Sequence, residues 1–280
     1  MYAVDFFDGA WYYYVMTDLH LHTRYSFDGK ESPKSYIAAA VGQGDKFIGF
    51  ADHCEYNMRE FDADFPTPDF DAYFSELHAL SEKFGDIAVL KGVELGYSDR
   101  AVEAYKKLLK KFPFDYSILS VHTVGDRGDC YYPAYFEGAD KRTAYTLYLE
   151  ETLKAVRSDV EFQVLGHLGY VARYAPYDEK DLVYADFADI IDKILHAIIE
   201  RGAALELNTS ATGLRSDVVT HGSIIARYAE LGGRSFAFGS DAHAVSRYAY
   251  GKDKAKTLLA SLGVRHTVRF ENRLPVKENF

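Results

Sequence analysis

The stretch "TDLHLHTRYSFDGK", residues 17–30, places two histidines one residue apart directly after a short apolar run. Side chains alternate with a period of two along an extended strand, so His20 and His22 are expected to point the same way. Two imidazoles that face one way can bind one cation, and Asp28 follows in the next loop. A second pair with the same spacing, Asp241 and His243, stands in "GSDAHA". The two pairs together predict a metal site.

Other residues that bind metals also follow short apolar runs of the chain. Imidazole and carboxylate suit zinc, manganese or iron better than calcium, and the absence of Cys-x-x-Cys spacing excludes a zinc finger. The predicted ligands number more than one ion needs, so we expect two or three divalent ions, with Glu94 as a bridge because a carboxylate has two oxygens. The predicted metal ligands are His20, His22, Asp28, His53, Glu94, His122, His167, Asp241 and His243.

A cluster of divalent ions favours hydrolysis. It lowers the pKa of a bridging water from 15.7 towards about 7 and stabilises an oxyanion in line with that nucleophile. We therefore predict attack by a metal-bridging hydroxide, with Glu94, Asp241 and His243 as catalytic residues.

Elements of two kinds alternate along the chain and must position these residues. Continuous apolar runs are typical of strands buried on both faces, and their alternation with helical segments is typical of parallel βα units. In such folds the active site forms at the carboxyl ends of the strands, where the predicted ligands stand. The seven predicted strands start at Val15, Phe47, Ile87, Tyr116, Phe162, Ala203 and Ser235.

Seven helical segments separate or follow these strands, several with Ser, Asp or Pro near the start and Gly at the end. They predict an α/β fold, a barrel of seven βα units. The longest predicted loop, residues 127–140, is a candidate lid. The predicted helices are Pro33–Gly44, Asp69–Gly85, Asp99–Phe112, Lys141–Ser158, Phe187–Gly202, Val219–Gly232 and Asp253–Leu262.

Bulk properties limit the class of protein. A chain of 280 residues without a Pro/Gly/Ser-rich linker favours one domain, here residues 16–280 after an N-terminal extension of residues 1–15. The formal charge of −10 argues against nucleic acid and anionic membranes as partners. Two cysteines and no signal peptide favour the cytoplasm. The sequence gives no indication of the oligomeric state.

Seven successive motifs resemble those of the PHP (polymerase and histidinol phosphatase) superfamily, and more narrowly the histidinol-phosphate phosphatases. They include "DLHLHTRYSFDGK", "FADHCEYN", "KGVELGY", "SVHTV", "GHLGYV", "LELNTSATGLR" and "FGSDAHA". This resemblance implies a distorted (β/α)7 TIM-like barrel with a trinuclear metal site. It assigns His20, His22, Glu94 and Asp241 to the first ion. The second ion takes Asp28, His53 and His243, and the third takes Glu94, His122 and His167.

The resemblance also implies a small phosphorylated substrate. Arginine binds a phosphate dianion with two hydrogen bonds, so Arg173 and Arg215 are the predicted phosphate clamp, and Asn208 is a further substrate-binding residue. Glu55, Tyr56 and the aromatic residues 131–136 are candidates to bind the ammonium and imidazole of L-histidinol phosphate.

Three other functions compete with hydrolysis of that ester. One is hydrolysis of another small phosphate ester, such as a nucleotide or sugar phosphate. Another is an amidohydrolase-type barrel, which is disfavoured because Glu94 stands where that family uses a lysine carbamate. The last is a metal-binding module without catalysis, which the complete ligand set disfavours.

Overall fold

Six of the seven predicted strands form one parallel sheet in the computed structural model, which describes residues 4–7, 10–13, 16–56 and 67–280. Its order is β11-β10-β9-β6-β5-β3, and β4 (His53–Cys54) pairs with β5 beyond the end of β3. The bounds are β3 Phe47–Phe50, β5 Ala88–Gly96, β6 Tyr116–Ser120, β9 Val164–Leu165, β10 Ala204–Asn208 and β11 Phe236–Gly239.

The segment around the two first histidines joins the two edges of this sheet. Leu19 N donates to Phe238 O of β11 at 3.0 Å, and Gly49 N of β3 donates to Asp18 O at 2.9 Å. The sheet therefore curls into a barrel, which confirms the predicted fold class. The predicted first strand forms isolated bridges rather than a regular strand, and its first residue, Val15, lies outside the described residues.

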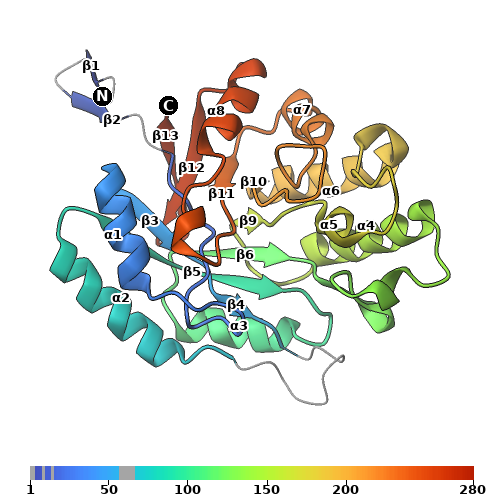
Figure 1. Ribbon diagram of the computed structural model, residues 1–280, viewed down its shortest axis with the longest axis horizontal. Coiled ribbons are helices and arrows are strands. Elements are labelled where there is room, and N and C mark those ends of the chain that lie inside the picture. The colour runs from blue at the N-terminus through green and yellow to red at the C-terminus, as the bar shows by residue number, and fades with distance from the viewer. Residues whose placement is uncertain (1–3, 8–9, 14–15, 57–66) are drawn as a thin grey trace.

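Helices surround the sheet, as Figure 1 shows. The predicted helices agree closely with the observed ones, because the residues that mark their ends in the sequence form caps in the structure. Asp69 and Asp140 accept backbone N–H bonds at the starts of α2 and α4. Gly44 and Gly202 end α1 and α6 in the left-handed conformation. The helices are α1 Pro33–Gln43, α2 Phe70–Phe84, α3 Val102–Lys111, α4 Lys141–Arg157, α5 Tyr170–Tyr174, α6 Ala188–Arg201, α7 Gly222–Glu230 and α8 Lys252–Ser261.

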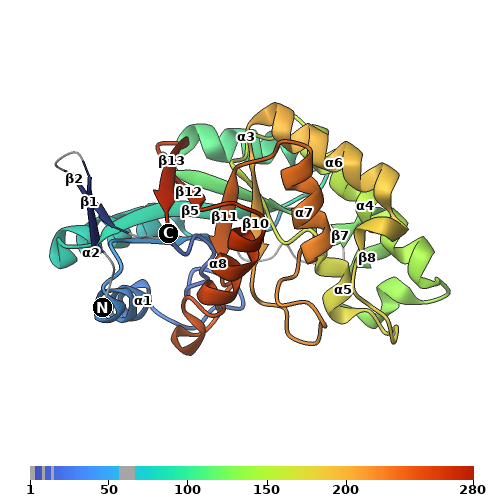
Figure 2. The same cartoon turned by 90° about the horizontal axis from the view of Figure 1, so that it is seen from above.

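Two antiparallel hairpins, one toward each terminus, were not predicted. β1 (Val4–Phe7) pairs with β2 (Ala10–Tyr13). This hairpin stands apart from the barrel in Figure 1, and Figure 2 shows it at the same end of the molecule as α1 and α2. β12 (His266–Glu271) pairs with β13 (Leu274–Asn279). The division of the chain into residues 1–15 and 16–280 stays a prediction.

The C-terminal hairpin completes the core inside the barrel. Val268 and Phe270 of β12 belong to one buried cluster with Leu19, Tyr116 and residues from the other strands. Glu278 of β13 accepts hydrogen bonds from the backbone N and the hydroxyl of Thr17 at 2.9 and 2.5 Å. The hairpin therefore covers the amino end of the barrel, and the carboxyl ends of the strands remain for the site.

The predicted lid segment, residues 127–140, contains short regular elements. β8 (Gly128–Asp129) pairs with β7 (Thr123–Val124), and short 3-10 helices span Gly125–Arg127 and Pro133–Phe136. Its role as a lid stays a prediction.

Among the helices of the described residues, none has the length and apolar character needed to cross a membrane.

Candidate metal centre

The carboxylate of Glu94 lies at the centre of the site, in the second half of β5. Its Oε2 is 3.2 Å from His20 Nε2 and 2.9 Å from His53 Nδ1. Its Oε1 is 2.9 Å from His167 Nε2. His122 Nε2 and His22 Nε2 lie slightly farther away, at 3.4 and 3.5 Å. One buried carboxylate therefore faces imidazoles from five separate positions of the chain.

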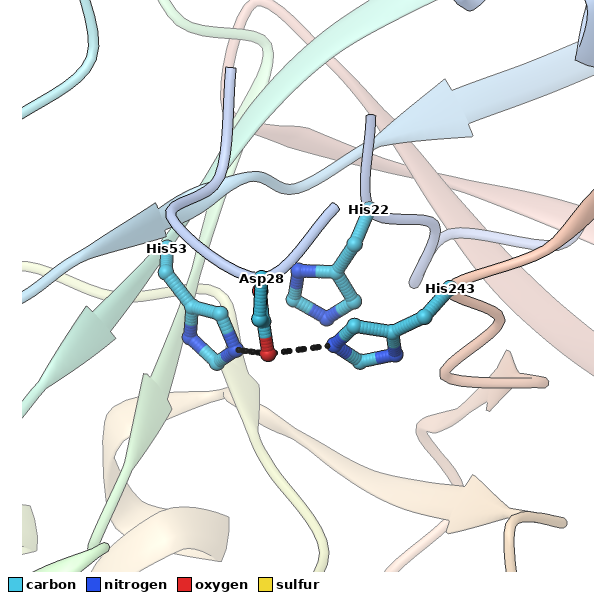
Figure 3. Close-up of side chains that lie close together, drawn as sticks. All are labelled: His22, Asp28, His53 and His243. Carbon is cyan, nitrogen blue, oxygen red and sulfur yellow. Dashed lines mark ion pairs between the residues drawn. The ribbon is translucent and has the colours of Figure 1, made fainter. Parts of the chain in front are cut away.

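A second group of side chains lies at the more open edge of the site. Figure 3 shows its members, His22, Asp28, His53 and His243. Asp28 Oδ2 lies 2.9 Å from His243 Nε2 and 3.6 Å from His53 Nε2. The ring of His22 stacks against those of His53 and His243, with centroids 4.3 and 4.1 Å apart. Residues from three distant parts of the sequence thus point their ligand atoms toward one another.

The ligands form three overlapping sets, and within each set the ligand atoms lie within 4.8 Å of one another. They are His20, His22 and Glu94; His22, Asp28, His53 and His243; and His53, Glu94 and His122. This grouping differs from the predicted assignment, because His22 also joins the second set and His53 also joins the third. Asp241 Oδ1 lies 3.3 Å from His22 Nε2, and His167 contacts Glu94, so all nine predicted ligands lie in one cluster.

The cluster fits divalent cations by its donor chemistry. Buried polar atoms normally have hydrogen-bond partners. Among the described residues, His20 Nε2, His22 Nε2, His53 Nδ1 and Glu94 Oε2 are buried and have none. All four point into the cluster, and all are nitrogen or oxygen atoms of the kind that zinc, manganese or iron binds.

Burial and the neighbouring ionisable side chains set the pKa values of the residues in the cluster. Burial alone would raise the pKa of Glu94, but His20, His53 and His122 outweigh it and hold that pKa well below its usual value. Burial lowers the pKa of His22 to about 3, and the neighbouring His243 and His53 act in the same direction. His22 is therefore neutral at pH 7, the form in which imidazole binds a metal.

Glu206 is a functional residue that the sequence analysis missed. Its Oε1 lies 2.5 Å from His20 Nδ1, and its Oε2 accepts the backbone N–H of His167 at 2.5 Å. It stands in "LELN" inside β10, and a carboxylate within an apolar strand needs a partner, which is the signal that marks this residue in the sequence. Gly239 makes room for this contact, because a Cβ atom there would overlap with the carboxylate of Glu206 and with His20.

Glu55 has a similar positioning role for His122. Its Oε1 lies 2.9 Å from His122 Nδ1, and a Cβ atom on Gly96 would overlap with its carboxylate. Burial alone would lower the pKa of His122, but Glu55 and Glu94 outweigh it and raise that pKa to about 10. Glu55 was predicted as a candidate partner of a substrate ammonium, whereas in the structure it holds a histidine of the cluster.

A cavity of about 330 Å³ opens over the cluster. Arg173 of α5 lines it and donates to Asp241 Oδ2 and to Ser210 Oγ, both at 3.0 Å. Asn208 is fully buried and donates to Glu206 and Asp241, at 3.3 and 3.4 Å. The structure thus places Asn208 beneath the cavity wall, as a link between two carboxylates.

Arg215, the second predicted arginine of the phosphate clamp, lies elsewhere. Its side chain is 71% exposed and donates to Glu179 at 2.7 Å, and it does not line the cavity. The residues between Asn208 and Arg215 form turns and bends that carry the arginine away from the end of β10. In this conformation only Arg173 of the predicted pair faces the site.

Comparison with known proteins agrees with this geometry. Histidinol-phosphatase from Lactococcus lactis is 29% identical over 268 residues, which cover 93% of this chain and 98% of that protein. The structure of histidinol phosphate phosphatase from the same organism, determined with zinc, L-histidinol and phosphate, superposes with a TM-score of 0.87 at 28% identity, covering 93% of this chain and 98% of that one.

A relative from Thermotoga maritima, named "Probable histidinol-phosphatase", is 33% identical over 230 residues, 81% of this chain and 84% of that protein. The PHP domain family matches residues 18–210, which include seven of the nine predicted ligands. The chain therefore belongs to the PHP domain family.

Proposed function

We propose that the protein is a metal-dependent phosphatase that hydrolyses L-histidinol phosphate to L-histidinol and phosphate. The observation that carries this proposal is the placement of Glu94 among five histidines at the carboxyl ends of the strands, beneath a cavity that is lined by Arg173 and by three of these histidines, His53, His122 and His167. The similarity to Lactococcus lactis histidinol-phosphatase over nearly the whole of both chains supports the substrate.

The nine clustered ligands would hold two or three divalent ions, zinc, manganese or iron. Glu94 is the proposed bridge, because each of its oxygens faces a different set of imidazoles. The ions would supply Lewis acidity and a nucleophile derived from water at neutral pH. Glu94, Asp241 and His243 are the proposed catalytic residues. Of the three, His243 lies with Asp28 at the open side of the cluster.

Residues of the chain perform the other tasks of the reaction. Arg173 can donate to the phosphate oxygens, since its guanidinium lines the cavity and is anchored by Asp241 and Ser210. Glu206 and Glu55 hold the rings of His20 and His122 in place. Water adds to phosphorus while the bond from phosphorus to the alcohol oxygen breaks, and that oxygen takes up a proton.

Phosphate release from L-histidinol phosphate tests this proposal. The assay uses protein loaded with zinc or manganese, beside a panel of nucleotide and sugar phosphates, and a large preference in kcat/KM for L-histidinol phosphate is expected. His20→Ala and Asp241→Ala should abolish turnover and keep the circular dichroism spectrum. Turnover that persists after chelation would contradict the metal-dependent reaction, and preference for another ester would replace the substrate.

A further inference from the structure

One buried serine connects three of the four ligands at the open edge of the metal cluster, the set shown in Figure 3. Ser26 Oγ lies 3.1 Å from Nδ1 of His22 and accepts the backbone N–H of His53 at 3.0 Å. Asp28 follows Ser26 by two residues in the same loop. Only 4% of Ser26 is exposed, so these contacts are shielded from water.

Asp52 holds this serine in place. The serine hydroxyl donates to Asp52 Oδ1 at 2.8 Å, and the backbone N–H groups of Ser26 and Thr23 donate to the same oxygen at 3.1 and 2.6 Å. The Thr23 hydroxyl donates to Oδ2 at 2.9 Å, and these hydrogen bonds compensate the burial of the acid. Asp52 belongs to none of the three ligand sets of the described residues, so the loop rather than a cation accounts for its position.

The hydrogen bonds decide the tautomer of His22. Asp52 Oδ1 accepts two backbone N–H groups, so this oxygen carries no proton whether or not the acid is ionised, and the Ser26 hydroxyl gives its only hydrogen to it. Ser26 Oγ can then only accept, from the His53 N–H and from the His22 ring. Nδ1 of His22 therefore carries the proton, and Nε2 directs its free electron pair into the cluster, 3.5 Å from Glu94.

The same residues fold the loop back toward the cluster. Ser26 N donates to Thr23 O at 3.0 Å, and Gly29 N donates to Ser26 O at 3.3 Å, so the loop makes consecutive tight turns. A Cβ atom on Gly29 would lie 1.9 Å from Thr23 O, because backbone lies directly against backbone there. Asp28 stands within these turns, and its Oδ2 lies 2.9 Å from His243 Nε2.

We propose that Ser26, fixed by Asp52, is the positioning residue for the ion that the ligand set of Figure 3 would hold. Its hydroxyl keeps the proton on Nδ1 of His22, and its backbone closes the turn that carries the carboxylate of the set. Carboxylates orient the rings of His20 and His122, whereas a neutral hydroxyl orients that of His22. This inference rests on the proposed function and adds the residues that build the open side of the metal cluster.

Ser26→Ala tests this role, because it removes the hydroxyl and keeps the backbone bonds of the turn. Zinc binding to the full-length protein is titrated against a competing chelator. Residues that orient metal ligands typically contribute about 10- to 100-fold to metal affinity, so at least one zinc ion should bind more weakly by that factor. The circular dichroism spectrum should match that of the wild type.

Nitrogen-15 NMR of the chelator-treated protein at neutral pH reads the tautomer of His22 directly. Its signal is the one that disappears in His22→Asn. In the wild-type protein the proton should lie on Nδ1, and in Ser26→Ala the Nδ1–H form should lose its preference. A general loss of packing would not change the proton position of this one ring.

Ser120→Ala is the matched control. Ser120 is also buried and stands two residues before a ligand, His122, but its hydroxyl has no hydrogen-bond partner among the described residues. It should keep the zinc affinities of the wild type. Unchanged affinities in Ser26→Ala, or a proton on Nε2 of His22 in the wild-type protein, would overturn the inference. A wild-type protein that binds no zinc would instead reject the proposed metal-dependent function.

Discussion

Nδ1 of His20 lies 2.5 Å from Oε1 of Glu206, and this contact fixes which nitrogen of the ring faces the metal cluster. A carboxylate accepts a hydrogen bond from Nδ1–H and so keeps the proton on that nitrogen, which leaves Nε2 with the free electron pair that a cation requires. The same arrangement recurs between His122 and Glu55. Carboxylates outside the predicted ligand set therefore prepare the histidines of that set for binding.

Glu206→Gln should weaken metal binding and leave the fold intact. Glutamine keeps one oxygen as an acceptor but no longer favours the Nδ1–H form of His20. Residues that orient metal ligands typically contribute about 10- to 100-fold to metal affinity, and we expect a loss of that size. Titration against a competing chelator measures it. Glu200→Gln, an exposed change on α6, is the control. Equal affinity in the two variants would contradict the role of Glu206.

Stability of the metal-free protein should fall as the pH rises. The pKa of His122 in the fold is about 10, above the unfolded value of about 6.5, so its ionisation contributes stability in full below pH 6.5. That contribution is lost as the pH rises towards 10. Urea unfolding of the chelator-treated protein at pH 6 and pH 10 measures the difference. Glu55→Gln removes the carboxylate that most raises this pKa, and should show a smaller difference; identical differences would reject this assignment.

Arg173 and Arg215 should respond differently to substitution. Arg173→Lys replaces a guanidinium that can bind phosphate with two hydrogen bonds by a single ammonium, and we expect about a 10- to 100-fold loss in kcat/KM. Arg215→Ala removes an exposed ion pair with Glu179 and should change kcat/KM by less than about 2-fold. Steady-state kinetics with L-histidinol phosphate separate the two. A similar loss in Arg215→Ala would show that this arginine enters the cavity during turnover.

Phe270→Ala should destabilise the barrel without removing its metals. The side chain is 2% exposed and packs inside the barrel beside Tyr116 and Ile118. Loss of a buried phenylalanine costs about 3–5 kcal/mol, because it removes apolar contacts and leaves a cavity. Denaturant unfolding measures this free energy, and metal analysis of the folded variant should match the wild type. Leu274→Ala, an exposed change on β13, should have little effect.

The sequence by itself determined the class of fold and the ligand types. Short apolar runs that alternate with capped helices predict parallel βα units, and the position of polar residues after those runs is a local property of the chain. Within the described residues, seven of the eight α-helices and six strands of the sheet lie where such local signals place them. The short helix α5 (Tyr170–Tyr174) was not predicted. His20, His22, Glu94 and Asp241 were found because each follows or ends an apolar run.

Only the tertiary structure decided which of the predicted ligands lie together, which arginine faces the cavity and what fills the barrel. These depend on distances between residues far apart in the chain, such as His22 and His243. Arg173 and Arg215 follow strand ends alike, but the turns after Asn208 direct Arg215 to Glu179 and solvent. Glu206 gained its role from His20, which approaches it only when the sheet curls, because closure brings the ends of separate strands around one cavity.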